Sequence, residues 1–389
     1  MDGPGTEPAA TTYTIDDLLE TMVALGASDL HVAVGSHPVI RLNGSLDRLE
    51  QFPRLSPDDT QRLLYRILST ERQKHLEINR QIDVSYSIPG LARFRVNVYF
   101  QRESLGGAFR MIPAELKTLE DLGLPSQLHE LSKKPRGLVL VTGPTGSGKS
   151  TTLAAVVDEI NRTRDDHIMT IEDPIEFLHR HKRCIVNQRE IGPDAVSFAD
   201  ALRGALRQDP DVILLGEMRD LETISTAITA AETGHLVLGT LHTQSAPGTV
   251  DRIIDVFPAE QQEQVRIMLA GSLQGIITQA LIPTADGQGR VAALEILLPD
   301  DATRNLIRQG KVEQIYSIMQ TSTGRGMTTM EQSLANLVLR RVITRESALA
   351  ASSRVEQLDG LLERSGYEIE TETQTELEPM HSGLRLAGS

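Results

Sequence analysis

The sequence predicts an α/β fold built around a phosphate-binding loop, and three observations support that prediction. Residues 143–151 read Gly-Pro-Thr-Gly-Ser-Gly-Lys-Ser-Thr, which fits the pattern G-x-x-x-x-G-K-[ST]. The apolar run 137–142 before the loop is typical of a buried strand, and 152–157 after it has helical spacing. Strands and helices then alternate further along the chain, as in a parallel α/β core. Strand, glycine loop and helix together direct backbone N–H groups at an anion, so we predict nucleotide binding.

The residue types of the loop each have a chemical reason. Glycines let the backbone curl and approach phosphate oxygens without a Cβ in the way. The cation of Lys149 would bridge the β- and γ-phosphates, and the Ser150 hydroxyl would ligate Mg²⁺. A chance match to the pattern is the alternative, and the flanking strand and helix argue against it. The residues predicted to bind the nucleotide here are Gly143, Pro144, Thr145, Gly146, Ser147, Gly148, Lys149, Ser150 and Thr151.

Composition limits the other functions that this chain could have. The chain has 389 residues, enough for two or three domains, and a formal net charge of −14. That acidity, with 3% aromatic residues and no Trp, disfavours nucleic-acid binding. Because Cys184 is the single cysteine, neither an internal disulfide nor a multi-cysteine zinc site can form, which suits a reducing cytoplasm. We expect no signal peptide and no membrane-spanning segment, since no apolar run approaches the roughly 18 residues that a span needs.

The pattern divides the chain into five parts. They are a disordered start at 1–12, a small α+β domain at 13–113, a linker at 114–135, the α/β domain with C-terminal helices at 136–365, and an acidic, disordered tail at 366–389. In the first domain we expect helices at 15–25 and from Ser56 onward, a strand at 29–34, a hairpin around Asn43-Gly44, and alternating strands within 83–113. The linker contains one short predicted helix, 125–131.

The α/β domain has its own predicted elements. Strands are expected near 137–142, 167–171, 211–216 and 236–241, and helices near 149–162, 197–207, 221–232 and 260–275. A later hairpin joins 278–283 to 290–298, and 300–364 is mostly helical in several short pieces.

Carboxylates follow two of these strands. Glu172, Asp173 and Glu176 lie within five residues at the end of one strand, where ligands gather in a parallel sheet. An exposed acidic turn is the alternative. Glu217 ends the predicted strand 211–216, in which four apolar residues lead to Gly216, and is placed to orient the attacking water. Mg²⁺ would then be held by Ser150, the phosphates and water on Glu176 or Glu217. Gly216 stands where an Asp commonly holds the metal, and an incidental Glu after a buried strand is the other interpretation.

Histidines lie at both ends of the strand 236–241. His235 and His242 are seven residues apart, which is about 23 Å along a strand and points their side chains to opposite faces. They therefore cannot share one metal or phosphate. His242, at the carboxyl end, is the candidate for sensing the γ-phosphate, whereas His235 is expected to contact a neighbouring element. A purely structural role is open for each.

These motifs together resemble the four signature boxes of the secretion ATPases. The resemblance rests on the phosphate loop, the acidic box 172–176, the strand 214–220 and the two-histidine box 234–243, and it spans roughly residues 13–365. More narrowly the chain resembles the PilT family of type IV pilus retraction ATPases, in which the Gly-Glu pair at 216–217 is part of the pattern. Residues 302–309 resemble the retraction-linked Ala-Ile-Arg-Asn-Leu-Ile-Arg-Glu motif, departing at Thr303 and Gln309.

The resemblance implies a RecA-like ATPase core with a smaller, PAS-like N-terminal domain. It further implies ATP and Mg²⁺ as cofactors, with catalytic roles for Lys149, Glu176 and Glu217, and ATP lying between the two domains. Arg93, Arg95 and Arg110 of the first domain would close on its phosphates, and our strand interpretation places Arg93 and Arg95 on one polar face. Solvent-facing strand arginines are the alternative. The residues implied in coupling to the pilus are Arg304, Asn305, Leu306, Ile307, Arg308 and His235.

The implied assembly is a cytoplasmic homohexamer, held at the inner face of the cytoplasmic membrane by an inner-membrane pilus platform protein. A paralogous accessory ATPase is a further implied partner, and this chain could itself be that paralogue. Three other functions stay open: a pilus assembly or type II secretion ATPase, a nucleic-acid motor, and a nucleotide-gated binding module without turnover. The assembly type commonly carries a tetracysteine zinc loop, which one cysteine cannot build.

Overall fold

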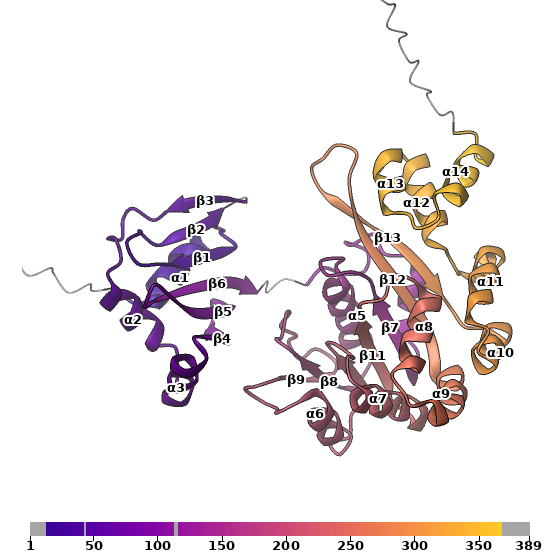
Figure 1. Cartoon of the computed structure of the whole chain (residues 1–389), viewed down its shortest axis with the longest axis horizontal. Coiled ribbons are helices and arrows are strands. Elements are labelled where there is room, and N and C mark those ends of the chain that lie inside the picture. The colour runs from indigo at the N-terminus through magenta and orange to yellow at the C-terminus, as the bar shows by residue number, and fades with distance from the viewer. Residues whose placement is uncertain (1–12, 43, 113–115, 368–389) are drawn as a thin grey trace, which may run out of the picture.

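The computed structural model describes residues 13–42, 44–112 and 116–367. Two sheets organise them: a six-stranded sheet of order β3-β2-β1-β6-β5-β4 and a seven-stranded sheet of order β13-β12-β7-β11-β10-β8-β9. Figure 1 shows the smaller, indigo part separate from the larger magenta-to-yellow part, with helices on both faces of the larger sheet. The predicted α/β class with a smaller α+β part and a helical C-terminal region is confirmed. The predicted disordered start at 1–12, and residues 368–389 of the predicted tail 366–389, lie outside the described residues.

The six-stranded sheet is antiparallel throughout, as the alternating pattern predicts. Phe94, Val96 and Val98 are fully buried from one face of β5, while Arg93 and Arg95 lie on the other. The helix that opens at Ser56 has the expected capping box with Asp59. A second helix, α3, was not predicted. The elements are α1 (Ile15–Ala24), β1 (Asp29–Val32), β2 (Val39–Leu42), β3 (Ser45–Arg48), α2 (Pro57–Tyr65), α3 (Thr70–Asn79), β4 (Gln81–Ile88), β5 (Ala92–Gln101) and β6 (Ser104–Ile112).

The seven-stranded sheet is parallel except for its edge strand β13, which pairs antiparallel with β12. Its predicted strands and helices are all present, and β9 and α8 are additional. The elements are α4 (Ser126–Ser132), β7 (Gly137–Thr142), α5 (Lys149–Thr163), β8 (His167–Glu172), β9 (Ile185–Glu190), α6 (Phe198–Ala205), β10 (Val212–Leu215), α7 (Leu221–Thr233), β11 (Leu236–Leu241), α8 (Ala246–Asp255), α9 (Ala259–Ser272), β12 (Leu273–Pro283) and β13 (Arg290–Leu297).

One predicted boundary in this part is wrong. The helix expected over 260–275 ends at Ser272, and residues from Leu273 onward form β12. Pairing explains the difference, because Leu273 faces Leu138 of β7 and Ile276 faces both β7 and β13. The backbone N–H and C=O groups from Leu273 onward therefore form hydrogen bonds with two neighbouring strands in place of bonds within a helix.

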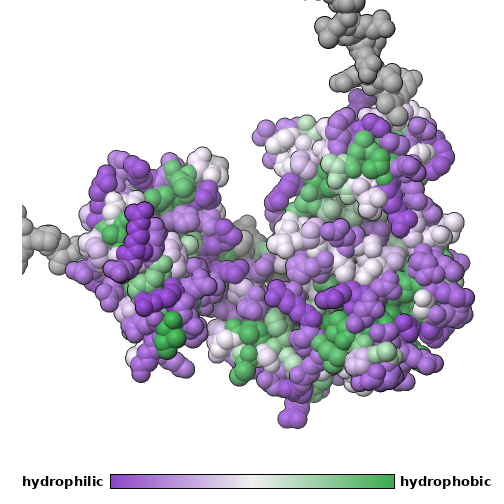
Figure 2. Space-filling view, viewed as in Figure 1, coloured by the Kyte–Doolittle hydropathy of each residue, from purple (hydrophilic) through white to green (hydrophobic). Residues whose placement is uncertain are grey.

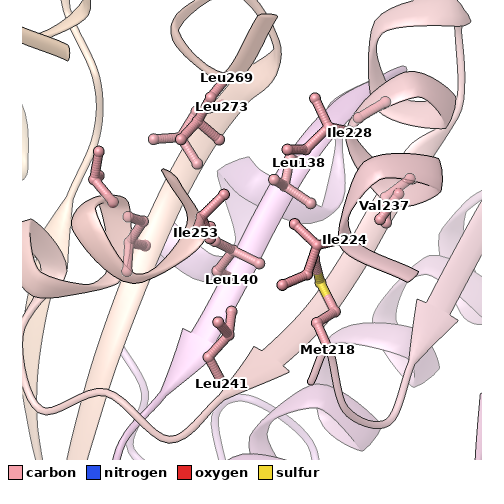
Figure 3. Close-up of a cluster of buried hydrophobic side chains, with 14 of the residues drawn as sticks. Leu138, Leu140, Met218, Ile224, Ile228, Val237, Leu241, Ile253, Leu269 and Leu273 are labelled. Carbon is pink, nitrogen blue, oxygen red and sulfur yellow. The ribbon is translucent and has the colours of Figure 1, made fainter. Parts of the chain in front are cut away.

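Both faces of the large sheet are buried, so its strands carry apolar side chains on both faces. All six residues of β7 are buried, with Leu138 and Leu140 in one cluster and Val139 and Val141 in another. Figure 3 shows the first cluster, in which Leu138 and Leu140 meet side chains from α7, α8 and α9. The second includes Leu119, Leu124, Leu128 and Leu131, which come from the predicted linker. Strands covered on both faces read as continuous apolar runs, as these do.

Short helices follow the large sheet, as predicted, and those within 330–364 pack on its edge hairpin. A separate cluster joins Ile282 of β12 and Ala293 of β13 to Leu334, Val338 and Leu358. The hairpin thereby connects the sheet to the C-terminal helices. These elements are α10 (Asp301–Gln309), η1 (Val312–Gln314), α11 (Ile315–Thr321), η2 (Thr323–Arg325), α12 (Met330–Leu339), α13 (Arg345–Ala351) and α14 (Val355–Arg364).

The surface on the face shown in Figure 2 is mainly hydrophilic, with hydrophobic residues in scattered groups. The most exposed large hydrophobic side chains are Val196 at 88% and Ile78 at 78%, and they belong to different parts of the chain. Within the part of the chain that the structure describes, no helix is both long enough and apolar enough to cross a bilayer.

Candidate functional site

The phosphate loop lies between the end of β7 and the start of α5, and two of its glycines have no substitute. Gly143 has φ 138°, and a Cβ there would lie 2.2 Å from the Gln279 carbonyl oxygen. Gly148 has φ 87° and precedes the first residue of α5. Side chains rarely adopt such backbone angles, and the first contact is shorter than atoms allow. The loop conformation therefore depends on glycine at both positions.

Lys149 points back into the loop. Its Nζ donates to the carbonyl oxygens of Gly143 at 2.9 Å and Pro144 at 3.0 Å. Burial lowers the pKa of its ammonium, and the negative charges of Glu217 and Glu176 act in the opposite direction. Because charged phosphate oxygens are stronger acceptors than neutral carbonyls, an arriving anion can replace these contacts.

A pocket of about 350 Å³ opens beside the loop, at the carboxyl ends of the parallel strands. Its lining brings together predicted residues from four separate motifs: Thr145, Lys149, Ser150, Glu176, Glu217 and His242. The carboxyl ends of parallel strands are the usual place for a ligand in this fold. Three-dimensional proximity of these residues is thus a property of the sheet order and not of the sequence spacing.

Glu217 is one of the residues that line this pocket. It follows β10 after Gly216, and its Oε1 lies 3.2 Å from Nε2 of His242. Arg219 also donates from Nε to the same oxygen. Gly216 itself lies close to β8, since a Cβ there would come within 3.2 Å of the Glu172 Cα. A side chain in place of Gly216 would therefore crowd that backbone.

The three clustered carboxylates have different surroundings. Glu172 is buried, and it accepts hydrogen bonds from Thr170 Oγ1 at 2.7 Å and Gln188 Nε2 at 3.2 Å. Burial raises the pKa of Glu172 in spite of these bonds. Asp173 and Glu176 are exposed. All three carboxylates line the pocket, and among them Glu176 acts electrostatically on the loop lysine.

The two histidines lie at opposite ends of β11. His242 follows its last residue and lines the pocket. His235 precedes its first residue, and its Nδ1 lies 3.0 Å from the Ala230 carbonyl oxygen of α7. The structure therefore brings His242 to the candidate site and leaves His235 away from it.

The arginines of the first sheet do not line the phosphate pocket in this structure. Arg93 donates to Glu190 at 2.6 Å, and Arg110 donates to Asp29 at 2.8 Å. Arg95 lines a different cleft of about 830 Å³, which Asp173 and Arg219 also line. Their approach to the phosphates therefore stays a prediction.

The predicted coupling residues 304–308 lie on α10, where Arg304 and Arg308 have different surroundings. Arg304 is half-buried, and its guanidinium donates to the carbonyl oxygens of Ala270 and Gly271 at the end of α9. Unpaired carbonyls at a helix C-terminus attract a cation, which explains the contact. Burial lowers the pKa of Arg304. In the same helix Ile307 is buried, Leu306 is partly buried, and Asn305 and Arg308 are exposed.

Three residues near the site were not predicted: Glu190, Arg219 and Gln279. Glu190 is 3% exposed, and its Oε2 accepts from Arg93 and from the Ile175 N–H at 3.2 Å. Arg219 follows Glu217 by two residues, so its nearness could have signalled a role. Gln279 is a polar residue within the apolar strand β12, a pattern that gives no indication of its partner.

This fold and site define the class of P-loop nucleotide-binding proteins: a parallel sheet, a glycine loop at the start of a helix, and carboxylates at neighbouring strand ends. A family model described as "Type II/IV secretion system protein" matches residues 6–378. The chain belongs to that family.

Individual relatives show which members of the family this chain is similar to. The chain is 52% identical over 334 residues to the type IV pilus retractation ATPase PilT of Pseudomonas aeruginosa, covering 86% of this chain and 96% of that protein. It is 41% identical over 343 residues to the type IV pilus ATPase PilU of the same organism, covering 88% and 90%. A crystal structure of the pilus retraction motor PilT with bound ADP superposes with a TM-score of 0.84 at 52% identity, covering 90% of this chain and 99% of that one. The resemblance to the PilT family is confirmed.

Proposed function

We propose that this protein is a motor ATPase that couples ATP hydrolysis to retraction of a type IV pilus, and so to twitching motility. The observation that carries the proposal is 52% identity with a pilus retractation ATPase over 96% of its length, together with an intact phosphate pocket. Identity with PilU is lower, at 41%, which favours the principal motor over an accessory one. The protein would act in the cytoplasm, at the inner face of the membrane, through a pilus platform protein.

The residues of the pocket fit a nucleotide phosphate with Mg²⁺. Gly143 and Gly148 leave the backbone open to an anion, and the buried Ser147 Oγ has no hydrogen-bond partner among the residues that the structure describes. Lys149 would bind the β- and γ-phosphates, and Ser150 would hold Mg²⁺ with water on Glu176 or Glu217. The metal would neutralise phosphate charge. Glu217 would hold the attacking water and accept its proton, and His242, in contact with it, would sense the γ-phosphate.

The first prediction concerns the two carboxylates. Glu217→Gln keeps the shape of the side chain but removes the group that polarises water, so we expect ATP binding to persist and turnover to fall about 10²-fold or more. Glu176→Gln should behave similarly, because its charge also acts on the pocket. ATP hydrolysis and nucleotide affinity should be measured side by side, with Lys149→Ala as the variant that loses both. Normal turnover by Glu176→Gln would reduce the acidic box to a structural turn.

The second prediction concerns the first-sheet arginines and assembly. In a homohexamer, Arg93, Arg95 and Arg110 would reach phosphates only on closure of the first part over a pocket, so hydrolysis should depend on the ring. Arg93→Ala and Arg95→Ala should each lower kcat more than nucleotide affinity. Arg48→Ala, on the exposed strand β3, is the control and should match wild type. Light scattering should give a hexamer, and a fully active monomer would contradict the proposal.

The third prediction separates retraction from assembly. Cells that lack this protein should carry surplus pili that do not retract, because polymerised pilin is no longer withdrawn. Fluorescence imaging of labelled pili in the deletion strain measures both quantities. Absence of pili would instead assign the protein to pilus assembly, and pili that retract normally would assign it an accessory role.

The fourth prediction concerns coupling through α10. Arg308 is exposed, whereas Arg304 holds the end of α9, so the two substitutions should differ. Arg308→Ala should leave purified ATPase activity within about twofold, since surface substitutions usually change stability by no more than about 0.5 kcal/mol, yet lower the retraction frequency. Arg304→Ala should lower thermal stability as well. Equal loss of ATPase rate and retraction in Arg308→Ala would show that the motif serves the ring or the catalytic site.

A further inference from the structure

Gln279 lies on β12, directly beyond the point where that strand pairs with β7 at Thr278 and Thr142. Its side chain is buried, with 3% exposed. Nε2 donates to the carbonyl oxygen of Ser147 at 2.7 Å, and Oε1 accepts from Oγ1 of Thr152 at 2.7 Å. One side chain thus holds both the phosphate loop and the first turn of the helix that follows it.

The chemistry of the partners fixes the orientation of this amide. The Ser147 carbonyl can only accept, so the amide nitrogen must face it, and the amide oxygen then faces the Thr152 hydroxyl, which must donate. All three side-chain and backbone groups are buried, where each unmade hydrogen bond is costly. The Gln279 amide can therefore make both hydrogen bonds in only one orientation.

That arrangement sets the direction of a backbone donor in the loop. In a trans peptide the C=O and the following N–H point in opposite directions. Because the Ser147 carbonyl points at Gln279, the Gly148 N–H points away from β12, toward the side where a phosphate binds at the start of α5. Loss of the Gln279 contact would free this peptide to rotate.

We infer that Gln279 is a positioning residue for the nucleotide reaction, acting through the Ser147–Gly148 peptide and through Thr152. The inference rests on the nucleotide binding proposed above. A loop held in its binding geometry before the ligand arrives loses less conformational freedom on binding, so the contact raises nucleotide affinity without touching the nucleotide.

Gln279→Met tests this because methionine has nearly the same length and removes both hydrogen bonds. The adjoining cavity of about 630 Å³, which Gln279 lines, leaves room for it. Titration calorimetry of the full chain with Mg²⁺ and ADP should show a Kd about tenfold higher than wild type, the scale of buried hydrogen bonds lost from a preorganised loop. Gln288→Met, on the exposed hairpin turn, is the matched control and should bind within about twofold of wild type.

Thr152→Val provides a second route if Gln279→Met does not fold. It removes only the hydroxyl donor, so a rise in Kd of about threefold is expected. If Thr152 acts through Gln279, adding Thr152→Val to Gln279→Met changes Kd by no more than about twofold.

The outcomes separate this inference from the function on which it rests. A folded Gln279→Met that binds Mg²⁺ and ADP within twofold of wild type, with only a lower Tm, would show a purely structural glutamine and overturn the inference. If Gln279→Met does not fold, an unchanged Kd in Thr152→Val overturns it. A wild-type chain that binds no ADP would overturn the proposed function itself, without reference to either variant.

Discussion

The close packing of the phosphate loop on β12 is the constraint on which the site depends. Gly143 lies so near the Gln279 carbonyl that no other side chain fits, and the Gln279 side chain holds the loop four residues further on. The Thr142 and Thr278 hydroxyls meet at 2.9 Å at the same level. Contacts with β12, which pairs with β7, thus hold the loop so that its backbone N–H groups face the pocket before any ligand is present.

The order of the parallel strands then determines which other groups reach that pocket. With β7, β11, β10 and β8 adjacent, the segments that follow each strand meet at one edge. Glu217, His242 and Glu176 therefore lie around the loop lysine although they are far apart in sequence. The negative charges of Glu217 and Glu176 act against the effect of burial, which is the larger and lowers the pKa of Lys149.

The edge hairpin β12–β13 extends this arrangement to the C-terminal helices. Gln279 of β12 contacts the loop, and Glu295 of β13 accepts from the Ala246 N–H at 2.5 Å, at the start of α8, shortly after His242. The outer parts of the same strands pack on α12 and α14. The phosphate loop and the segment after His242 are therefore both connected to those helices through residues in direct contact. On the other side, Arg93 contacts Glu190 and so connects the first sheet to the acidic box.

The sequence by itself was enough to predict the phosphate loop, the core strands and the family. These features are local: a glycine pattern, apolar runs bounded by turns, and helix caps such as Ser56 with Asp59. Local geometry limits which residues can occupy such positions, so these features can be recognised in the sequence before the fold is known. The Gly-Glu pair at 216–217 could also be recognised as a pattern, although the closeness of Gly216 to β8 could not.

Tertiary structure decided the rest, because the deciding contacts join residues far apart in the chain. The helix expected over 260–275 yields to β12 where two neighbouring strands offer backbone partners. Arg304 turns to the end of α9 because unpaired carbonyls lie there, which no spacing within 302–309 reveals. Glu172 and Glu176 look alike in sequence and both line the pocket, yet Glu172 is buried with a raised pKa whereas Glu176 is exposed. Gln279 is the clearest case, since its two partners are more than a hundred residues away and only strand pairing brings them within 2.7 Å.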